Sequence, residues 1–251
     1  MIRRMIPLAF SFFLVFSACN EEEEIISTPN DPTRTSLNTI MTLGASRVEG
    51  ARPEFESYRY ELWKLLLDGG WEFDYIGTQK DPANYPTHAS KSFDTDHEGR
   101  GGWTSGQILS GIEDWLNEAG APDIVLFSSP GGNDALEGLS YEEALANVNA
   151  IIDAIQVANP NVTIIIEQLA PARSDLMTAE LTTFFNRMQE DVVTLASQQS
   201  TANSQVLTVD MATGFKDSFL ADDVHYNEAG ARFIANQYYD VMQSVWEAGT
   251  N

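Results

Sequence analysis

The sequence of 251 residues contains a single cysteine, Cys19, and only three histidines. Without a second cysteine, a folded domain cannot have an internal disulfide bond or a metal site built from several thiolates. Basic residues are also scarce, since 14 lysines and arginines stand against 37 aspartates and glutamates and give a net charge of −23. A chain this acidic repels nucleic acid and anionic lipid headgroups, so we expect neither as a direct partner.

The N-terminus has the layout of a secretory signal. Two arginines at positions 3 and 4 precede an apolar run from Ile6 to Phe16, and small residues follow before Cys19. The run is too short for a comfortable membrane span. The stretch "LVFSAC" resembles a bacterial lipobox, which implies cleavage before Cys19 and lipidation of that residue. The alternative is a soluble secreted protein that is cut nearby.

The segment after Cys19 is acidic and then rich in Pro, Ser and Thr, with little periodicity. Such a composition is typical of a flexible tether. We therefore predict a lipoprotein signal peptide over 1–18, a tether over 19–37 with a lipidated Cys19, and one domain over 38–251. The expected location is outside the cytoplasm, on the outer membrane, at the cell surface or in the periplasm, with the lipid as the only membrane anchor.

From residue 39 onward, short apolar runs alternate with amphipathic segments. The runs predict strands at 39–43, 71–77, 123–130, 161–169 and 204–210, and the segments between and after them predict helices at 58–70, 104–118, 140–157, 178–198 and 227–246. Residues 78–102 are expected to form a long polar loop. This alternation predicts an α/β domain, a three-layer α/β/α sandwich around a parallel sheet of about five strands.

Four polar stretches fall at or near loops beside the carboxyl ends of these strands, where open α/β sheets bind ligands. The stretches and the residues of interest in them are "GAS" with Ser46, "GRGGWTSGQI" with Gly102, "PGGND" with Asn133, and "ADDVHYNEAG" with Asp222 and His225. Each stretch taken alone is also ordinary turn chemistry. Together they are the candidate functional residues of the domain.

The same residue types suit acyl transfer. A serine hydroxyl is a weak nucleophile until a base takes its proton, and imidazole titrates near neutral pH. Asp222 could orient the imidazole of His225, and an asparagine amide could donate to a developing oxyanion.

The order Ser, Gly, Asn, His with an aspartate three residues before the histidine resembles the SGNH hydrolases, also called GDSL esterases. The neighbouring "YRYELWKLL" and "EGRGGWTSGQI" are similar to the acetylxylan esterases of carbohydrate esterase family three. The resemblance implies a flavodoxin-like fold, no cofactor, and hydrolysis of small acyl esters, above all acetyl, on carbohydrate. It also implies a triad of Ser46, His225 and Asp222, and an oxyanion hole formed by Ser46, Gly102 and Asn133.

One position departs from the family's pattern. Ala45 stands where the Gly-Asp-Ser motif has aspartate. This leaves two alternatives open: a carbohydrate-binding pseudoenzyme on the same fold, or a GDSL hydrolase of the lipase or thioesterase type.

Other residues have two readings each. His88 and His97 lie in the polar loop, where "DTDHE" superficially suggests a metal site. Zinc needs three or four converging ligands, so we predict no metal site here. We place this loop at the surface or the substrate rim. Trp103 could stack on a sugar or pack in the core. Arg47 could contact substrate, or could pair with nearby glutamates as Arg52 and Arg59 could.

Overall fold

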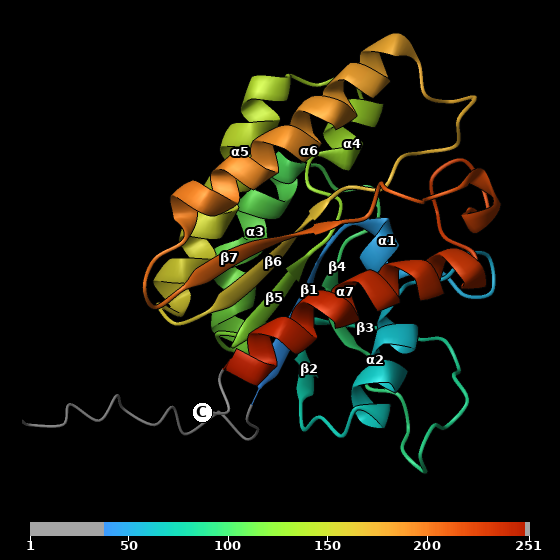
Figure 1. The fold of residues 1–251 in the computed structure, drawn as a ribbon, viewed down its shortest axis with the longest axis vertical. Coiled ribbons are helices and arrows are strands. Elements are labelled where there is room, and N and C mark those ends of the chain that lie inside the picture. The colour runs from blue at the N-terminus through green and yellow to red at the C-terminus, as the bar shows by residue number, and fades with distance from the viewer. Residues whose placement is uncertain (1–37, 249–251) are drawn as a thin grey trace, which may run out of the picture. The chain divides into compact units, whose positions relative to one another are not determined.

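The computed structural model describes the backbone of residues 38–248 and the side chains through Ser244. The predicted signal peptide, Cys19 and the tether lie outside the described residues. Within the described range the chain forms the expected three layers, with a mostly parallel sheet between two groups of helices (Figure 1).

The sheet has seven strands. They are β1 (Thr39–Gly44), β2 (Asp74–Ile76), β3 (Gln79–Lys80), β4 (Asp96–Gly99), β5 (Ile124–Phe127), β6 (Thr163–Gln168) and β7 (Gln205–Asp210). Their order is β3-β4-β1-β5-β6-β7, and β2 pairs with β1 beside β4. All pairs are parallel except β3 with β4. The carboxyl ends of β1, β5 and β6 therefore meet at one edge.

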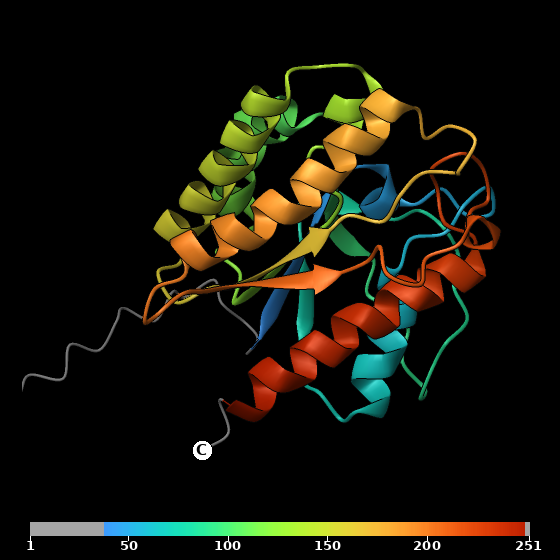
Figure 2. The ribbon, with the colours of Figure 1, turned by 45° about the horizontal axis from the view of Figure 1, so that its top comes forward.

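The central strands are mostly apolar because both faces are covered. Side chains alternate between two cores: Met41 and Leu43 of β1 lie in one, and Ile40 lies in the other. The first core is closed by α3 (Ser105–Ala119), α5 (Tyr141–Ala158) and α6 (Ala179–Gln199), and the second by α2 (Arg59–Asp68) and α7 (Glu228–Ala248) (Figure 2). Three short helices complete the domain: α1 (Ser46–Glu49), α4 (Gly132–Leu136) and the 3-10 helix η1 (Asp217–Phe219). None of the helices in this part of the chain is both long and apolar enough to cross a bilayer.

The prediction of an α/β three-layer sandwich is confirmed, but the count of about five strands was too low. The two extra strands, β3 and β4, lie inside the stretch predicted as a polar loop. They were not predicted because β4 consists of "DHEG", which has no apolar pattern. Its polar side chains are buried with partners instead of exposed.

The surface placement of that loop was wrong for several residues, among them Asp81, His97 and Glu98. His97 is 2% exposed and Glu98 is fully buried. The Glu98 carboxylate pairs with Arg100 at 2.7 Å and accepts a hydrogen bond from the Thr78 amide at 2.8 Å. Burial of a charge is tolerated when it is paired in this way. His88 does lie near the surface, where it pairs with Asp68 at 2.6 Å.

Candidate active site

Ser46 is the first residue of α1, directly after β1. The carbonyl of Ala45 accepts hydrogen bonds from the amides of Val48 and Glu49, both at 3.0 Å, and these bonds close the turn. A four-residue helix is not stable by itself, because nucleating a helix costs more free energy than the hydrogen bonds of one turn contribute. The orientation of Ser46 therefore depends on the contacts that the rest of the domain makes with α1.

Ser46, His225 and Asp222 form a hydrogen-bonded row. The Oγ atom of Ser46 lies 2.8 Å from Nε2 of His225, and Nδ1 of His225 lies 2.7 Å from Oδ2 of Asp222. The first pair is separated by 179 positions in the sequence, so only the fold brings it together. An aspartate bonded to Nδ1 favours the tautomer in which Nε2 is free to accept the serine proton.

Asp222 is held in the ionised state. Its Oδ1 atom accepts hydrogen bonds from the amides of Val224 at 2.9 Å and His225 at 2.7 Å. Partial burial acts to raise the pKa of Asp222, but these bonds and the His225 ring outweigh it and lower the pKa to about 2. The carboxylate is therefore charged at every pH at which a histidine can act as a base.

Asn133 lies in α4, beside the same edge. Its Nδ2 atom donates to the carbonyl of Trp103 at 2.8 Å, which uses one of the two amide hydrogens and leaves the other to bind elsewhere. The next residue, Asp134, is buried and accepts hydrogen bonds from the Ser105 amide at 2.8 Å and the Ser105 hydroxyl at 2.7 Å. These three bonds fix Asn133 against the loop that enters α3.

Gly102 occupies that loop with φ of 78°, a left-handed conformation that favours glycine. It is exposed, and a Cβ atom added there would meet open space. Among the described residues, Ser46 and Asn133 line one pocket and Gly102 does not. The structure thus brings together Ser46, His225 and Asp222 in one row and Ser46 and Asn133 in one pocket.

The pocket has a volume of about 410 Å³, counting the space open to solvent at its mouth. Its lining includes the polar residues Ser46 and Asn133 and the apolar residues Leu136, Leu169, Ala172 and Phe185. Such a mixture of a few polar groups and an apolar wall suits a small ligand with a short apolar end.

Two residues considered as substrate contacts have structural partners. The Trp103 ring is half-buried, packs against the core and lies 5.5 Å from the Trp115 ring, which favours its packing role. Arg47 lines the pocket but is only 7% exposed, and its guanidinium donates to backbone carbonyls. The expected pairing with glutamate does hold for Arg52, which contacts Glu56 at 3.3 Å.

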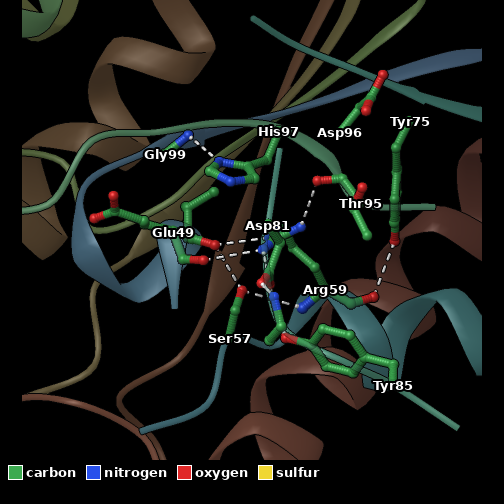
Figure 3. Close-up of polar contacts among 12 residues, drawn as sticks. Glu49, Ser57, Arg59, Tyr75, Asp81, Tyr85, Thr95, Asp96, His97 and Gly99 are labelled. Atoms are coloured by element: carbon green, nitrogen blue, oxygen red, sulfur yellow. Dashed lines mark hydrogen bonds and ion pairs between the residues drawn. The ribbon is translucent and has the colours of Figure 1, made fainter. Parts of the chain in front are cut away.

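Arg59 holds the far end of α1, a role that was not predicted. Its side chain is fully buried and donates to the carbonyls of Val48 at 2.7 Å and Glu49 at 3.0 Å, the last residues of α1 (Figure 3). Asp81 neutralises it at 2.7 Å. Nothing in the sequence distinguishes this arginine from a surface one, because Asp81 stands 22 positions away in the polar loop.

Comparisons with known proteins agree with this geometry. Residues 66–233 match the model of the GDSL-like lipase/acylhydrolase family. This range contains Gly102, Asn133, Asp222 and His225 and begins after Ser46. No curated protein sequence matches the chain.

Three solved structures are similar over most of both chains. An acetyl esterase, a serine-to-alanine mutant with an acetate ion, has a TM-score of 0.73 and 25% identity and covers 85% of this chain and 100% of its own. A family 3 carbohydrate esterase from Talaromyces cellulolyticus has a TM-score of 0.72 and 26% identity, with 84% and 99% covered. A family 3 carbohydrate esterase from Clostridium thermocellum has a TM-score of 0.66 and 30% identity, with 83% and 98% covered. The chain belongs to the GDSL-like lipase/acylhydrolase family and is a carboxylic ester hydrolase.

Proposed function

We propose that this hydrolase is a serine esterase that removes small acyl groups, above all acetyl, from a carbohydrate. The observation that carries the proposal is the row Ser46–His225–Asp222, with contacts of 2.8 and 2.7 Å, opening into the pocket that Asn133 lines. Nucleophile, base and orienting acid stand in the geometry that nucleophilic ester hydrolysis requires.

The reaction follows from these positions. The Oγ atom of Ser46 attacks the ester carbonyl carbon while its proton passes to Nε2 of His225. The tetrahedral intermediate then expels the sugar oxygen, which takes that proton and leaves as an alcohol, so that the acyl group remains on Ser46. Water, deprotonated by His225, then attacks the acyl group. As the bond from the acyl carbon to Oγ of Ser46 breaks, His225 returns the proton to Oγ, which frees Ser46 and releases the carboxylic acid.

The negative charge on the carbonyl oxygen of the intermediate must be stabilised by hydrogen-bond donors. We assign this role to the amides of Ser46 and Gly102 and to the remaining Nδ2 hydrogen of Asn133. Donors fixed before the reaction stabilise the charge without reorganising during it. The bonds from Asn133 to the Trp103 carbonyl and from the Ser105 amide to Asp134 supply that fixation.

The substrate assignment rests on two supports. The similar structures include an acetyl esterase and two family 3 carbohydrate esterases. The apolar side chains that line the pocket with Ser46 also suit a short acyl group. A longer acyl chain, as a lipase or thioesterase would take, is the alternative that a substrate panel separates.

The test uses the purified domain, its Ser46→Ala variant, a fluorophosphonate probe, aryl esters of increasing acyl length and acetylated xylan. We expect covalent labelling at Ser46, fastest turnover on the acetyl ester, and release of acetate from xylan, all lost in Ser46→Ala. Equal rates in both proteins would exclude Ser46 as the nucleophile. No labelling combined with glycan binding would indicate a carbohydrate-binding protein, and faster turnover on long acyl esters a lipase-like enzyme.

We also propose that the enzyme is exported and anchored through a lipid on Cys19. The support comes from the sequence alone, which has an arginine pair, then an apolar run, and then its sole cysteine after "LVFSA". Expression in a bacterium with labelled palmitate should give a labelled, membrane-associated protein, and Cys19→Ala should give an unlabelled one. A mature N-terminus elsewhere than Cys19, without lipid, would contradict the proposal.

A further inference from the structure

Arg47 follows the proposed nucleophile in the sequence, but its side chain turns into the protein and is only 7% exposed. From there it reaches three other loops at the carboxyl edge of the sheet. One of these loops carries His225, one leads to Asn133, and one follows β6.

The contact to the histidine loop is direct. The Nε atom of Arg47 donates to the carbonyl of Val224 at 2.8 Å, one residue before His225. Because Ser46 and Arg47 are adjacent in α1, this bond ties the nucleophile turn to the base loop across 177 positions. Any movement of one loop away from the other stretches this bond and the Ser46–His225 contact together.

The remaining donors hold the neighbouring loops. Nη1 donates to the carbonyl of Ala170 at 2.8 Å, and Nη2 donates to that of Pro171 at 3.1 Å. Nη1 also lies 3.4 Å from the hydroxyl of Ser129, four residues before Asn133. Only the planar fork of an arginine presents donors in enough directions for these acceptors, and lysine has a single ammonium group. The Tyr226 ring lies 4.8 Å from the guanidinium carbon.

Ser129, which Arg47 contacts, is also bound by a buried carboxyl group. Glu167, fully buried on β6, accepts hydrogen bonds from the Ser129 amide at 2.7 Å and the Ser129 hydroxyl at 3.3 Å. Burial raises the pKa of Glu167, whereas the Ser129 amide and the charge of Arg47 act to lower it. Ser129 itself has φ of 49°, an uncommon conformation for a residue with a side chain. The bonds that Ser129 donates to Glu167 and accepts from Arg47 hold it there.

Two other residues near the site, Ala45 and Arg173, do not provide the link that Arg47 provides. Ala45, at the start of α1, has no side-chain group that could hold the turn by a hydrogen bond. Arg173 also holds the histidine loop, through its amide to the Asp223 carbonyl at 2.8 Å and its side chain to the Asp222 carbonyl, but it is one-third exposed and has no link to α1. Arg47 is therefore the residue that couples that loop to the nucleophile.

We propose that Arg47 is a positioning residue that sets the distance between Ser46 and His225 by fixing the nucleophile turn to the loops after β5, β6 and β7. The proposal rests on the function proposed above, in which Ser46 is the nucleophile and His225 the base. In this assignment Arg47 acts through Ser46 and the neighbouring loops and not on the reacting atoms. Its loss should therefore slow the chemical step and leave substrate binding nearly unchanged.

The experiment compares the wild type with Arg47→Ala, Arg47→Lys and, as a matched control, Arg232→Ala. Arg232 is an exposed arginine on α7 that pairs with Glu228 at 2.6 Å. For each folded variant, kcat and KM are measured on an aryl acetate well below its melting temperature, together with the rate of fluorophosphonate labelling. Both rates are then repeated with guanidinium chloride at concentrations far below those that unfold the protein.

We expect Arg47→Ala to lower kcat and the labelling rate by about 10- to 100-fold, since misplacement by about 1 Å costs that much, with KM nearly unchanged. Added guanidinium should restore part of both rates in Arg47→Ala only, because the free ion can occupy the place of the side chain. The kcat and labelling rate of Arg47→Lys should lie between those of the wild type and Arg47→Ala, and those of Arg232→Ala should match the wild type.

The outcomes separate the two proposals. A wild type that the probe does not label at Ser46 overturns the proposed nucleophile and the role of Arg47 with it. A labelled wild type with unchanged kcat in Arg47→Ala overturns the positioning role alone. If Arg47→Ala does not fold, Arg47→Lys carries the test, and a kcat equal to that of the wild type overturns the role. A loss expressed in KM, without guanidinium rescue, would make Arg47 a substrate contact.

Discussion

The rings of Phe55 and His225 stack face to face, with their centroids 3.8 Å apart and their planes 13° from parallel. Phe55 lies in the loop between α1 and α2, which the Glu56 amide joins to the histidine loop by a bond to the Tyr226 carbonyl at 2.8 Å. The stack covers one face of the imidazole, while its two nitrogens face Ser46 and Asp222. Phe55 thus limits the rotation of the ring out of the row.

Replacing Phe55 by alanine should lower kcat on an aryl acetate. An aromatic pair contributes about 0.5–1.5 kcal/mol beyond its buried area, which corresponds to a decrease of roughly 2- to 10-fold if it is fully expressed in the transition state. Phe55→Tyr keeps the ring and should stay near the wild-type rate. If Phe55→Ala turns over as fast as Phe55→Tyr, the stack has no part in holding His225.

Replacing Asn133 by alanine removes the proposed side-chain donor to the oxyanion. Loss of one such donor typically costs about 10²–10³ in kcat, and we expect a decrease in that range with a much smaller change in KM. The melting temperature must be measured as well, because Asn133 also bonds to the Trp103 carbonyl. A decrease in stability with an unchanged kcat would assign Asn133 a structural role only.

The parts of the fold that the sequence predicts are those with a periodic apolar pattern. The strands β1, β5 and β6 and the helices α3, α5 and α6 lie within a few residues of their predicted ranges, because burial on both faces or on one helical face leaves a pattern in the sequence. The position of Ser46 at the end of β1 follows from the same pattern. The strand β4 was missed, since Glu98 and His97 are buried through partners and not through apolar side chains.

The supporting residues of the site were missed for a related reason. Arg47 and Arg59 were expected to pair with nearby glutamates, yet both bind backbone carbonyls, and the acidic partner of Arg59 is Asp81. A backbone carbonyl has no signature in a sequence, because every residue has one. Which arginine is buried therefore depends on the three-dimensional path of loops that share no local pattern.

The ion pair of Arg59 with Asp81 should matter far more for stability than a pair at the surface. Its side chains are 0% and 6% exposed, whereas those of the Lys80–Asp96 pair are 75% and 28% exposed. Asp81→Asn leaves the buried guanidinium without its counter-charge, and we expect a loss of about 3–5 kcal/mol in the free energy of unfolding. The matched change Asp96→Asn should cost about 0–1 kcal/mol.

Both variants are measured by urea unfolding at neutral pH, and each replaces a carboxylate by an amide of the same shape. The comparison therefore isolates the effect of burial. Equal losses in the two variants would mean that Asp81 does not neutralise Arg59 in solution. If Asp81→Asn has a much lower free energy of unfolding, its kcat should also be lower, because Arg59 holds the Val48 and Glu49 carbonyls at the end of α1.

The buried histidine of β4 should make the domain less stable in acid. Burial, followed by the charges of Arg59 and Arg100, lowers the pKa of His97 from 6.5 to about 3, and its Nδ1 atom accepts a hydrogen bond from the Gly99 amide at 3.0 Å. Between these two pKa values the unfolded chain binds a proton at this position that the folded chain does not. The free energy of unfolding therefore decreases as the pH falls from 6.5 toward 3, by up to about 1.4 kcal/mol per pH unit.

His97→Asn keeps an acceptor near the Gly99 amide but cannot titrate, so its free energy of unfolding should decrease less steeply over this range. The variant loses some stability at neutral pH through the smaller side chain, and the comparison therefore uses the slope against pH. Asp94, whose pKa burial raises from 3.8 to about 6, contributes with the opposite sign, since the folded chain holds its proton more tightly. That contribution is common to both proteins and cancels in the difference. Identical slopes from urea unfolding at several pH values would show that His97 is protonated in the folded protein.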